Sequence, residues 1–386
     1  MKVVRIVSEL DFGGVEQVMA NSIPGLVSDG DIEVSIIVLG KGGQIAQELL
    51  QKGIQVNVLN QNPRIPNFGL VFRLRKMLVD IKADVLHCQG GEANFHGILA
   101  GHWAGVNRII GEEIGIPNHH SYWKYIFRWV YSKANLVIAI SEAVKNAIVE
   151  LGEVEEEKVR VVYNPVTMGK RSVDFSFLTS VLHGEPENDK GDVIGNGAVE
   201  MLGKLKNEKS FVFVTTCRMV QIKNLDRLIL AFYEVLKEEG EKRMELWIVG
   251  DGPLKEKLIH QVKSLGIGSK VKFWGFQKNV FQFLEMADAF VLPSLREGSS
   301  VSLAEAMTCG LPSVVTQVGG ACEILGSSKS GVMVDPLDVS SIKSGMASLA
   351  TLTDLERKLM GERAMLEAER FSTETYLKSL EVIYKG

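Results

Sequence analysis

Residues Ala289–Thr316 read AFVLPSLREGSSVSLAEAMTCGLPSVVT and predict a complete strand–helix–strand unit. The runs AFVL and SVVT at its two ends have the length and the apolar, β-branched composition of buried strands. Between them we expect a helix that begins near Ser299 or Ser300 and ends at Gly310. Two strands joined by one helix are typically parallel neighbours with a right-handed crossover, so this stretch indicates a parallel α/β sheet.

The alternation of short apolar runs with helix-length segments continues in both directions. The candidate strands of the first half are Val3–Val7, Glu33–Leu39, Gln55–Leu59, Asp84–Cys88, Asn107–Gly111, Leu136–Ile140 and Val159–Tyr163. Those of the second half are Phe211–Thr216, Glu245–Val249, Lys270–Trp274, Ala289–Leu292, Ser313–Thr316 and Gly331–Val334. Helical segments include Glu16–Val27, Ile45–Gln51, Val71–Ile81, Ser141–Leu151, Ile342–Ala350, Thr353–Glu369 and the amphipathic Thr373–Tyr384. The pattern predicts doubly wound parallel sheets, which bind ligands at the carboxyl ends of their strands.

The pattern fades from Met168 to about Ser210, where the chain is polar and rich in Gly, Asp, Glu and Lys. One helix is expected inside this stretch, near Ala198–Lys206. We interpret the stretch as the boundary between two α/β domains in tandem.

Bulk composition agrees with two ordinary globular domains. The chain has 386 residues, of which 46% are hydrophobic and 23% charged, and its net charge is −4. The charge gives no reason to expect a nucleic-acid partner. The cysteines are scattered without a CxxC pair, which suits a reducing compartment. The N-terminus reads as a first strand, and no apolar run is long enough to span a membrane. We therefore expect a cytoplasmic protein whose membrane contact, if any, is peripheral.

The first expected strand leads into a loop with paired glycines, Gly13 and Gly14, followed by a helix. Glycines let the backbone approach a ligand closely, and a helix N-terminus favours phosphate. The pair alone is also compatible with a simple tight turn. It is not a GxGxxG fingerprint, which argues against a dehydrogenase.

The strand Phe211–Thr216 delivers two cations, Arg218 and Lys223, into the next loop. Two fixed positive charges suit a diphosphate, above all one that gains charge as it departs. A solvated basic loop is the alternative, but the position after a first strand favours a site.

Two carboxylates flank the helix in the stretch quoted at the outset. Glu297 precedes the helix N-terminus, where it can accept hydrogen bonds from sugar hydroxyls while the helix holds phosphate. Glu305 lies on an otherwise apolar helix, where a carboxylate is costly without a partner. The alternative is an acid that stabilises the helix dipole and an exposed glutamate.

Several motifs together resemble glycosyltransferase family 4. The run around Arg218 and Lys223 is similar to that family's Gly-Arg-Leu-x-x-x-Lys-Asn/Gly motif, and Glu297 and Glu305 fit its Glu-x7-Glu motif. Further matches are Val249–Pro253, Val318–Gly320, Gly13-Gly14-x-Glu16, Asp84-Val-x-His87, Ile140–Glu142 and Asn164–Val166. The resemblance covers nearly the whole chain, and the order and placement of the motifs make it specific.

This resemblance implies a GT-B fold and a retaining, metal-independent transfer from a nucleotide-diphosphate sugar, usually a UDP-sugar. The donor-site residues that it implies are Gly13, Gly14, Arg218, Lys223, Phe276, Glu297, Ser302, Leu303 and Glu305, with Arg218, Lys223 and Glu297 catalytic. It implies a glycan or lipid-linked acceptor, as in surface polysaccharide or glycolipid synthesis. It also implies that the last helix returns to the first domain. The domains would then be residues 1–166 with 373–386, and residues 167–372.

On the acceptor side the sequence departs from the family. Ile114 stands where many members carry a histidine. Glu113 is a candidate substitute, and His87 is a second acceptor-side candidate. His119 and His120 follow nearby, and we interpret them as structural or solvated.

The resemblance implies no cofactor and no metal. Asp29-Gly30-Asp31 has the Asp-x-Asp pattern with which another class of glycosyltransferases holds a divalent ion, but here it is most simply a turn. Phe72–Lys76 and Tyr122–Lys133 mix bases with aromatic residues. For the second segment, packing on the core with a basic edge is favoured over contact with anionic lipid, and both stay open. Two other functions also stay open: a nucleotide-sugar epimerase-like enzyme, and a non-catalytic nucleotide-sugar-binding subunit.

Overall fold

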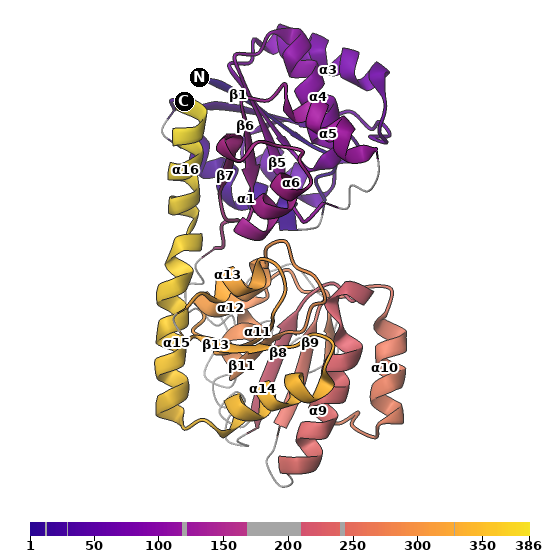
Figure 1. Cartoon of the computed structure of the whole chain (residues 1–386), viewed down its shortest axis with the longest axis vertical. Coiled ribbons are helices and arrows are strands. Elements are labelled where there is room, and N and C mark those ends of the chain that lie inside the picture. The colour runs from indigo at the N-terminus through magenta and orange to yellow at the C-terminus, as the bar shows by residue number, and fades with distance from the viewer. Residues whose placement is uncertain (12–13, 29, 118–121, 168–209, 240–243, 328) are drawn as a thin grey trace.

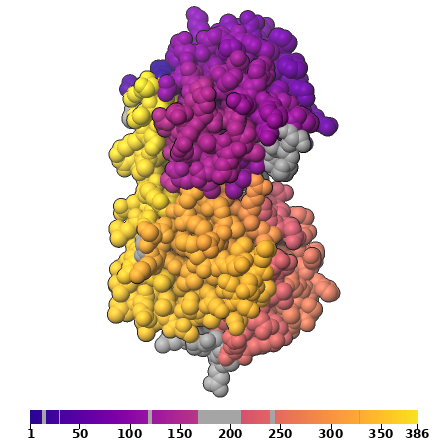
Figure 2. Space-filling model, viewed as in Figure 1, coloured from indigo at the N-terminus to yellow at the C-terminus, as the bar shows by residue number. Residues whose placement is uncertain are grey.

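The computed structural model describes the chain except for residues 12–13, 29, 118–121, 168–209, 240–243 and 328. Two α/β domains lie one above the other along the long axis, and the C-terminal helices form a column along one side of both (Figure 1). Figure 2 shows this column against the surface of both domains. The helix expected near Ala198–Lys206 lies outside the described residues.

The first domain is a seven-stranded parallel sheet with the order β3-β2-β1-β4-β5-β6-β7. Its strands are β1 (Lys2–Val7), β2 (Glu33–Val38), β3 (Gln55–Val58), β4 (Val85–Gln89), β5 (Arg108–Glu113), β6 (Leu136–Ala139) and β7 (Val159–Val161). Its helices are α1 (Gly14–Val27), α2 (Gln44–Gln51), α3 (Phe68–Ile81), α4 (Gly91–Ala104), α5 (Trp123–Tyr131), α6 (Glu142–Glu150) and the short η1 (Glu156–Lys158). Residues of α3, α4, α5 and α6 build one apolar core, and residues of α1 and α2 build another. The sheet is therefore covered on both faces, as parallel sheets require.

The second domain is a six-stranded parallel sheet with the order β10-β9-β8-β11-β12-β13. Its strands are β8 (Phe211–Thr216), β9 (Met244–Val249), β10 (Val271–Gly275), β11 (Ala289–Leu292), β12 (Ser313–Thr316) and β13 (Gly331–Val334). Its helices are η2 (Gln221–Lys223), α9 (Leu225–Glu239), α10 (Lys255–Ser264), α11 (Phe281–Met286), α12 (Val301–Thr308), α13 (Ala321–Leu325), α14 (Val339–Thr351), α15 (Asp354–Ala368) and η3 (Glu369–Phe371). The predicted fold class, two doubly wound parallel sheets, is confirmed.

Every predicted strand is present within a few residues of its expected ends. One difference matters for the site: β5 does not end at Gly111 but continues to Glu113, which pairs with Ala139 of β6. Two successive glutamates looked like the start of a loop, yet both lie inside the sheet.

The last helix, α16 (Thr373–Lys385), packs on the first domain. Its side chains Tyr376, Leu380, Ile383 and Tyr384 lie in the same apolar core as residues of α1 and β2. Two segments that cross between the domains run side by side: the Val166 N–H donates to the Phe371 carbonyl at 2.8 Å.

A fully buried polar cluster anchors α16 to the first sheet. The Tyr384 hydroxyl lies 2.8 Å from Nδ1 of His87, and His87 Nε2 lies 2.8 Å from a Glu112 carboxylate oxygen. Burial, then the charge of Arg5, lowers the pKa of His87 to about 4. The ring is therefore neutral at pH 7, with Nε2 facing the Glu112 carboxylate and Nδ1 accepting from the Tyr384 hydroxyl. Arg5 lies 3.9 Å from the same carboxylate, so the buried charge of Glu112 is paired.

Replacing Tyr384 with Phe should lower the free energy of unfolding of the first domain by about 1–2 kcal/mol, because it leaves Nδ1 of a buried His87 without a donor. The measurement is urea denaturation of the full chain. Tyr125→Phe is the control, since Tyr125 is 63% exposed. Equal stabilities of the two variants would contradict an anchoring role for this hydroxyl.

Candidate functional site

Loops that follow strands of both sheets meet between the domains. Ser141, after β6, donates from Oγ to the carbonyl of Gly298, after β11, at 2.5 Å. Arg296 donates to the carbonyls of Ile116 and Pro117, after β5, at 2.7 and 3.1 Å. The carboxyl ends of both sheets therefore face one another, and ligands of such sheets bind there.

Glu297 lies at this junction, and only 6% of its surface is exposed. Its Oε1 accepts from the Lys223 ammonium at 2.5 Å and from the Ser294 hydroxyl at 2.7 Å. The structure thus brings together two of the predicted site residues, from the loops after β8 and β11. A buried carboxylate needs such partners, because an unpaired one would be strongly destabilised.

The backbone around Glu297 is held by unusually close contacts. The Gly320 N–H donates to the Glu297 carbonyl at 3.1 Å. A Cβ on Gly319 or Gly320 would collide with the carbonyls of Glu297 or Gly298. These two glycines of the Val318–Gly320 motif therefore allow the next loop to lie directly on the site.

The loop that carries Arg218 and Lys223 is held in place by contacts of Gly250 and Asn224. Gly250 adopts φ of +132°, and a Cβ there would collide with the Cys217 carbonyl. Fully buried Asn224 donates to the carbonyls of Pro293 and Pro336, both at 2.8 Å. One amide thus joins the loops after β8, β11 and β13. It is a site-building residue that the sequence analysis mentioned only as part of a motif.

Arg218 is exposed, and its guanidinium has no ion pair or hydrogen bond within the part of the chain that the structure describes. It follows the same strand as Lys223, but unlike Lys223 it is not engaged by a carboxylate. An arginine in this state can bind an incoming phosphate bidentately without first breaking another contact.

Helix α12 begins at the N-cap Ser300, whose Oγ accepts from the Leu303 N–H at 3.3 Å. The Leu303 side chain is fully buried, so any contact of Leu303 with a ligand has to come from the backbone. The Ala304 N–H donates to the Ser300 carbonyl at 3.2 Å. Within the described residues, this leaves the N–H groups of Val301 and Ser302 at the helix N-terminus for an anion.

Glu305 is half-buried on α12, and no hydrogen bond to its carboxylate is found within the described residues. Burial raises the pKa of Glu305 from 4.5 to about 7, because desolvation penalises the charged form. The carboxyl can therefore accept a hydrogen-bonding ligand without first breaking a contact of its own among the described residues.

The remaining donor-site candidates occupy the expected loops. Phe276 follows β10 and is 58% exposed. Gly14 is the first residue of α1, after β1. Gly13 lies outside the described residues.

The two acceptor-side candidates are not on the surface, and these predictions require correction. His87 is fully buried inside β4, bonded to Tyr384 and Glu112. Glu113 is 5% exposed inside β5, where it accepts from the Tyr131 hydroxyl and from Asn94. Both side chains support the first domain from within, and neither offers a face to an acceptor.

The nearest exposed side chain after β5 is Ile114, which is 38% exposed. Gly115 lies so close to the second domain that a Cβ on Gly298 would stand 2.9 Å from its Cα. His119 and His120 lie outside the described residues.

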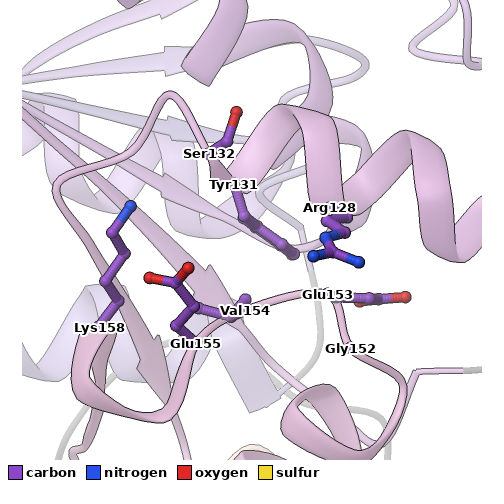
Figure 3. A pocket seen from close by; sticks show the side chains of 8 residues that line it. All are labelled: Arg128, Tyr131, Ser132, Gly152, Glu153, Val154, Glu155 and Lys158. Atoms are coloured by element: carbon purple, nitrogen blue, oxygen red, sulfur yellow. The ribbon is translucent and has the colours of Figure 1, made fainter.

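A pocket of about 210 Å³ in the first domain lies elsewhere (Figure 3). Its lining includes Ser132 and Lys158, which precede β6 and β7 respectively. It therefore opens at the amino ends of these strands, whereas Glu297 lies where the carboxyl ends of the two sheets meet.

Two family models match the chain. Residues 12–169 match the model described as Glycosyltransferase Family 4, and residues 200–365 match the model described as Glycosyl transferases group 1. With two parallel-sheet domains joined at their carboxyl ends, these matches define a GT-B glycosyltransferase. The chain belongs to the family 4 type of these enzymes.

Curated relatives share this class. N-acetyl-alpha-D-glucosaminyl L-malate synthase of Bacillus anthracis is 32% identical over 183 residues, 47% of this chain and 46% of the relative, so the chain spans about half the length of that relative. The N-acetylgalactosamine-N,N'-diacetylbacillosaminyl-diphospho-undecaprenol 4-alpha-N-acetylgalactosaminyltransferase of Campylobacter jejuni is 24% identical over 94% of this chain and 93% of its own. The UDP-Gal:alpha-D-GlcNAc-diphosphoundecaprenol alpha-1,3-galactosyltransferase of Escherichia coli is 26% identical over 75% and 71%.

Solved structures share the fold. HepE of Anabaena in complex with UDP has a TM-score of 0.78 at 19% identity, covering 99% of this chain and 98% of HepE. A glycosyltransferase of Rickettsia africae has a TM-score of 0.79 at 18% identity, covering 100% and 97%. These identities establish the architecture alone.

The raised pKa of Glu305 predicts a pH dependence of stability without ligand. The folded state holds this proton more tightly than the unfolded state, so stability falls as the pH rises from about 4.5 to 7. Glu305→Gln removes this loss. The variant should match the wild type near pH 4.5 and exceed it at pH 8 by roughly 3 kcal/mol.

The measurement is chemical denaturation of both proteins across this pH range. Glu256→Gln, at an exposed position on α10, is the control. Parallel stability curves for wild type and Glu305→Gln would show that Glu305 titrates normally.

Proposed function

We propose that the protein is a retaining glycosyltransferase that moves a sugar from a UDP-sugar to a glycan or lipid-linked acceptor, in surface polysaccharide or glycolipid synthesis. The observation that carries the proposal is the Glu297–Lys223 pair at the carboxyl ends of the second sheet, with Arg218 in the same loop as Lys223 and unbonded among the described residues. Relatives named for undecaprenol-linked acceptors and a neighbour with bound UDP support the substrate classes.

In this proposal the donor diphosphate binds between Arg218, Lys223 and the N-terminus of α12. The bond from the sugar C1 to the β-phosphate oxygen breaks, and these positive groups stabilise the charge that gathers on the phosphate. The acceptor hydroxyl attacks C1 from the same face and gives its proton to the leaving phosphate oxygen. Glu297 positions the sugar hydroxyls and stabilises the positive charge that develops on the ring.

We propose that no divalent cation takes part. Arg218 and Lys223 together supply two positive charges to the diphosphate, which is the task that a bound cation performs in metal-dependent transfer. Glu305 then serves the ribose hydroxyls, for which a half-buried carboxyl without a protein partner is suited.

We further propose that the first domain works at the inner face of a membrane. Helix α5 packs on the core through Phe127, Val130 and Tyr131, which bears out the favoured interpretation of that face. Its other face exposes Tyr125 (63%) and Trp129 (48%).

A second exposed aromatic group lies on the neighbouring helices. Phe72 of α3 is 60% exposed and stacks on Trp103 of α4 at 5.6 Å, beside exposed Arg73 and Lys76. We call these exposed residues the aromatic–basic face; they are Phe72, Arg73, Lys76, Trp103, Tyr125, Arg128 and Trp129. Aromatic rings with flanking bases suit an anionic lipid surface. No helix among the described residues is long and apolar enough to cross a bilayer.

Glu297→Ala and Arg218→Ala should each lower transfer by about 100-fold or more, the scale of removing one group that stabilises transition-state charge. The measurement is a panel of UDP-, GDP- and ADP-sugars, read by thermal shift, by donor hydrolysis and by transfer to undecaprenyl-diphosphate-linked glycans. One donor should respond in the wild type alone.

The panel is run in EDTA with Arg363→Ala as a matched control, because Arg363 is an exposed arginine on α15 of the same domain. Activity that returns only with Mg²⁺ or Mn²⁺ would contradict the metal-free mechanism. Conversion of the donor to an epimer without acceptor would favour an epimerase, and binding without turnover would favour a non-catalytic subunit.

Binding to liposomes should require anionic lipid and should weaken on removal of the aromatic–basic face. The test is flotation with phosphatidylglycerol-containing and pure phosphatidylcholine vesicles, using wild type and a Tyr125→Ser, Trp129→Ser double variant. Each lost base near the surface is worth about 1 kcal/mol, so Arg73→Gln, Lys76→Gln should reduce binding and its salt dependence. Absence of binding at low salt would refute the proposal.

A further inference from the structure

We propose that Glu323 is a positioning residue that ties the loop carrying Glu297 to the first domain, and that sugar transfer depends on this tie while nucleotide binding does not. The inference rests on the proposed transferase function. Glu323 lies on α13, outside every site residue expected from the sequence.

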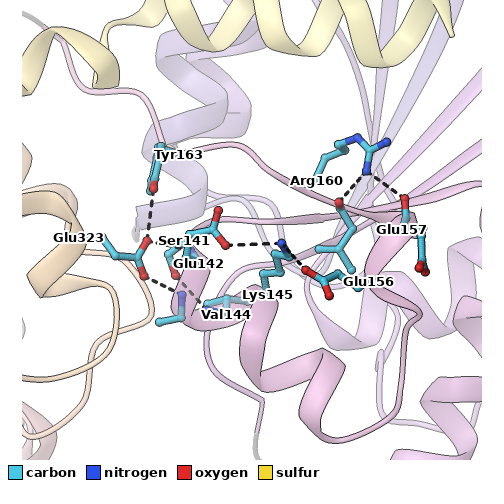
Figure 4. Close-up of polar contacts among 11 residues, drawn as sticks. Ser141, Glu142, Val144, Lys145, Glu156, Glu157, Arg160, Tyr163 and Glu323 are labelled. Atoms are coloured by element: carbon cyan, nitrogen blue, oxygen red, sulfur yellow. Dashed lines mark hydrogen bonds and ion pairs between the residues drawn. The ribbon is translucent and has the colours of Figure 1, made fainter.

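The tie is a carboxylate from one domain bound to a helix N-terminus of the other (Figure 4). Oε2 of Glu323 accepts from the Glu142 N–H at 2.7 Å, and Oε1 accepts from the Ala143 N–H at 2.6 Å. The Tyr163 hydroxyl lies 3.3 Å from Oε2. Glu142 and Ala143 open helix α6 of the first domain, so the contact crosses the junction directly.

The first turn of α6 is completed by this contact. Its next N–H, on Val144, donates to the Ser141 hydroxyl at 3.1 Å, and the Lys145 N–H donates to the Ser141 carbonyl at 3.0 Å. The N–H groups of the first three helical residues, which have no intrahelical acceptor, are therefore all bonded, two of them by the other domain. A carboxylate is the favoured partner there, because it meets the positive end of the helix dipole.

The charge of Glu142 itself does not oppose the tie. Its carboxylate lies 3.7 Å from the Lys145 ammonium, which also pairs with Glu156 at 3.0 Å (Figure 4). The carboxylate of Glu323 is thus the one directed at the α6 backbone.

The N-terminus of α6 also contacts the Glu297 loop directly. Ser141, the N-cap of α6, donates to the Gly298 carbonyl, while Gly320, immediately before α13, donates to the Glu297 carbonyl. Glu297 is therefore connected to the N-terminus of α6 on both sides: through Gly298 and Ser141, and through Gly320 and Glu323. Loss of Glu323 frees α13 from that helix and leaves the loop attached through Ser141 and Arg296.

Donor phosphate groups bind elsewhere. Arg218, Lys223 and the start of α12 all belong to the second domain, and no contact of theirs with Glu323 is found among the described residues. We therefore expect Glu323 to set the position of the donor sugar relative to the first domain, and not the affinity for the nucleotide.

The test alters each half of the tie separately. Glu323→Ala removes the carboxylate, and Glu323→Gln keeps its shape and one good acceptor. Glu142→Pro removes one donor from the first domain: proline is favoured at the first helical position, and Ser141 before it is already extended at φ −164° and ψ 163°. Glu142→Ala controls for the lost side chain. Glu48→Gln controls for loss of an exposed inter-domain ion pair, with Lys278.

We expect Glu323→Ala and Glu142→Pro to lower kcat about 10- to 100-fold, as for one or two charge-assisted hydrogen bonds. Donor KM and UDP affinity by calorimetry should change less than about twofold, the glutamine variant should be intermediate, and both controls should resemble the wild type. The Glu323→Ala, Glu142→Pro double variant should lose little more than either single variant, because both remove the same tie.

A readout independent of activity is amide hydrogen exchange of the peptide that contains residues 142–144, which should lose protection in Glu323→Ala. Unchanged exchange would overturn the tie, and unchanged kcat in a transferring wild type would overturn its role in transfer. Parallel loss of UDP binding and melting temperature would reduce Glu323 to a structural residue. If the wild type transfers no sugar, the proposed function fails, and the exchange experiment still decides whether the tie exists.

Discussion

The ion pair between Lys223 and Glu297 is the contact around which the second domain's site is arranged. A carboxylate buried to 6% exposure is stable only with close partners, and the structure supplies an ammonium and the Ser294 hydroxyl. To bring these groups together, the loops after β8, β11 and β12 must approach within hydrogen-bonding distance of one another. Asn224 joins the first two loops, and the glycines before α13 admit the third.

The first domain satisfies a comparable constraint in a different way. Arg5 and His87 have no exposed surface and Glu112 has only 2%, so each depends on the others and on Tyr384. Because Tyr384 comes from the last helix, the first sheet is complete only when the end of the chain returns to it. The buried charges thus couple residues that are hundreds of positions apart, and removing one partner would leave a buried charge uncompensated.

These long-range partners explain what the sequence could and could not predict. Strands such as β8 and β11 were predicted with correct bounds, because buried parallel strands read as short apolar runs wherever they occur. Glu297 and Lys223 were placed correctly in loops after strands. Glu112 and Glu113 lay beyond the predicted strand end at Gly111, because the partners that bury them lie far away in sequence. Helix α4 was not among the example helices named from the sequence; it is buried on nearly every side and contains Gly97 and Gly101, where a Cβ would collide with neighbouring side chains.

The separation of roles between the domains follows from where the charged groups lie. The cations that suit a diphosphate, and the start of α12, belong to the second domain, so in the proposed function the donor phosphates bind mainly to that domain. Glu297 differs, because its neighbours Arg296 and Gly298 both bond to the first domain. The sugar end of a bound donor would therefore lie where both domains meet, with Ile114 the nearest exposed side chain after β5. In the proposed function an acceptor would be recognised by surface loops of the first domain, since its buried polar residues are already occupied in holding the sheet together.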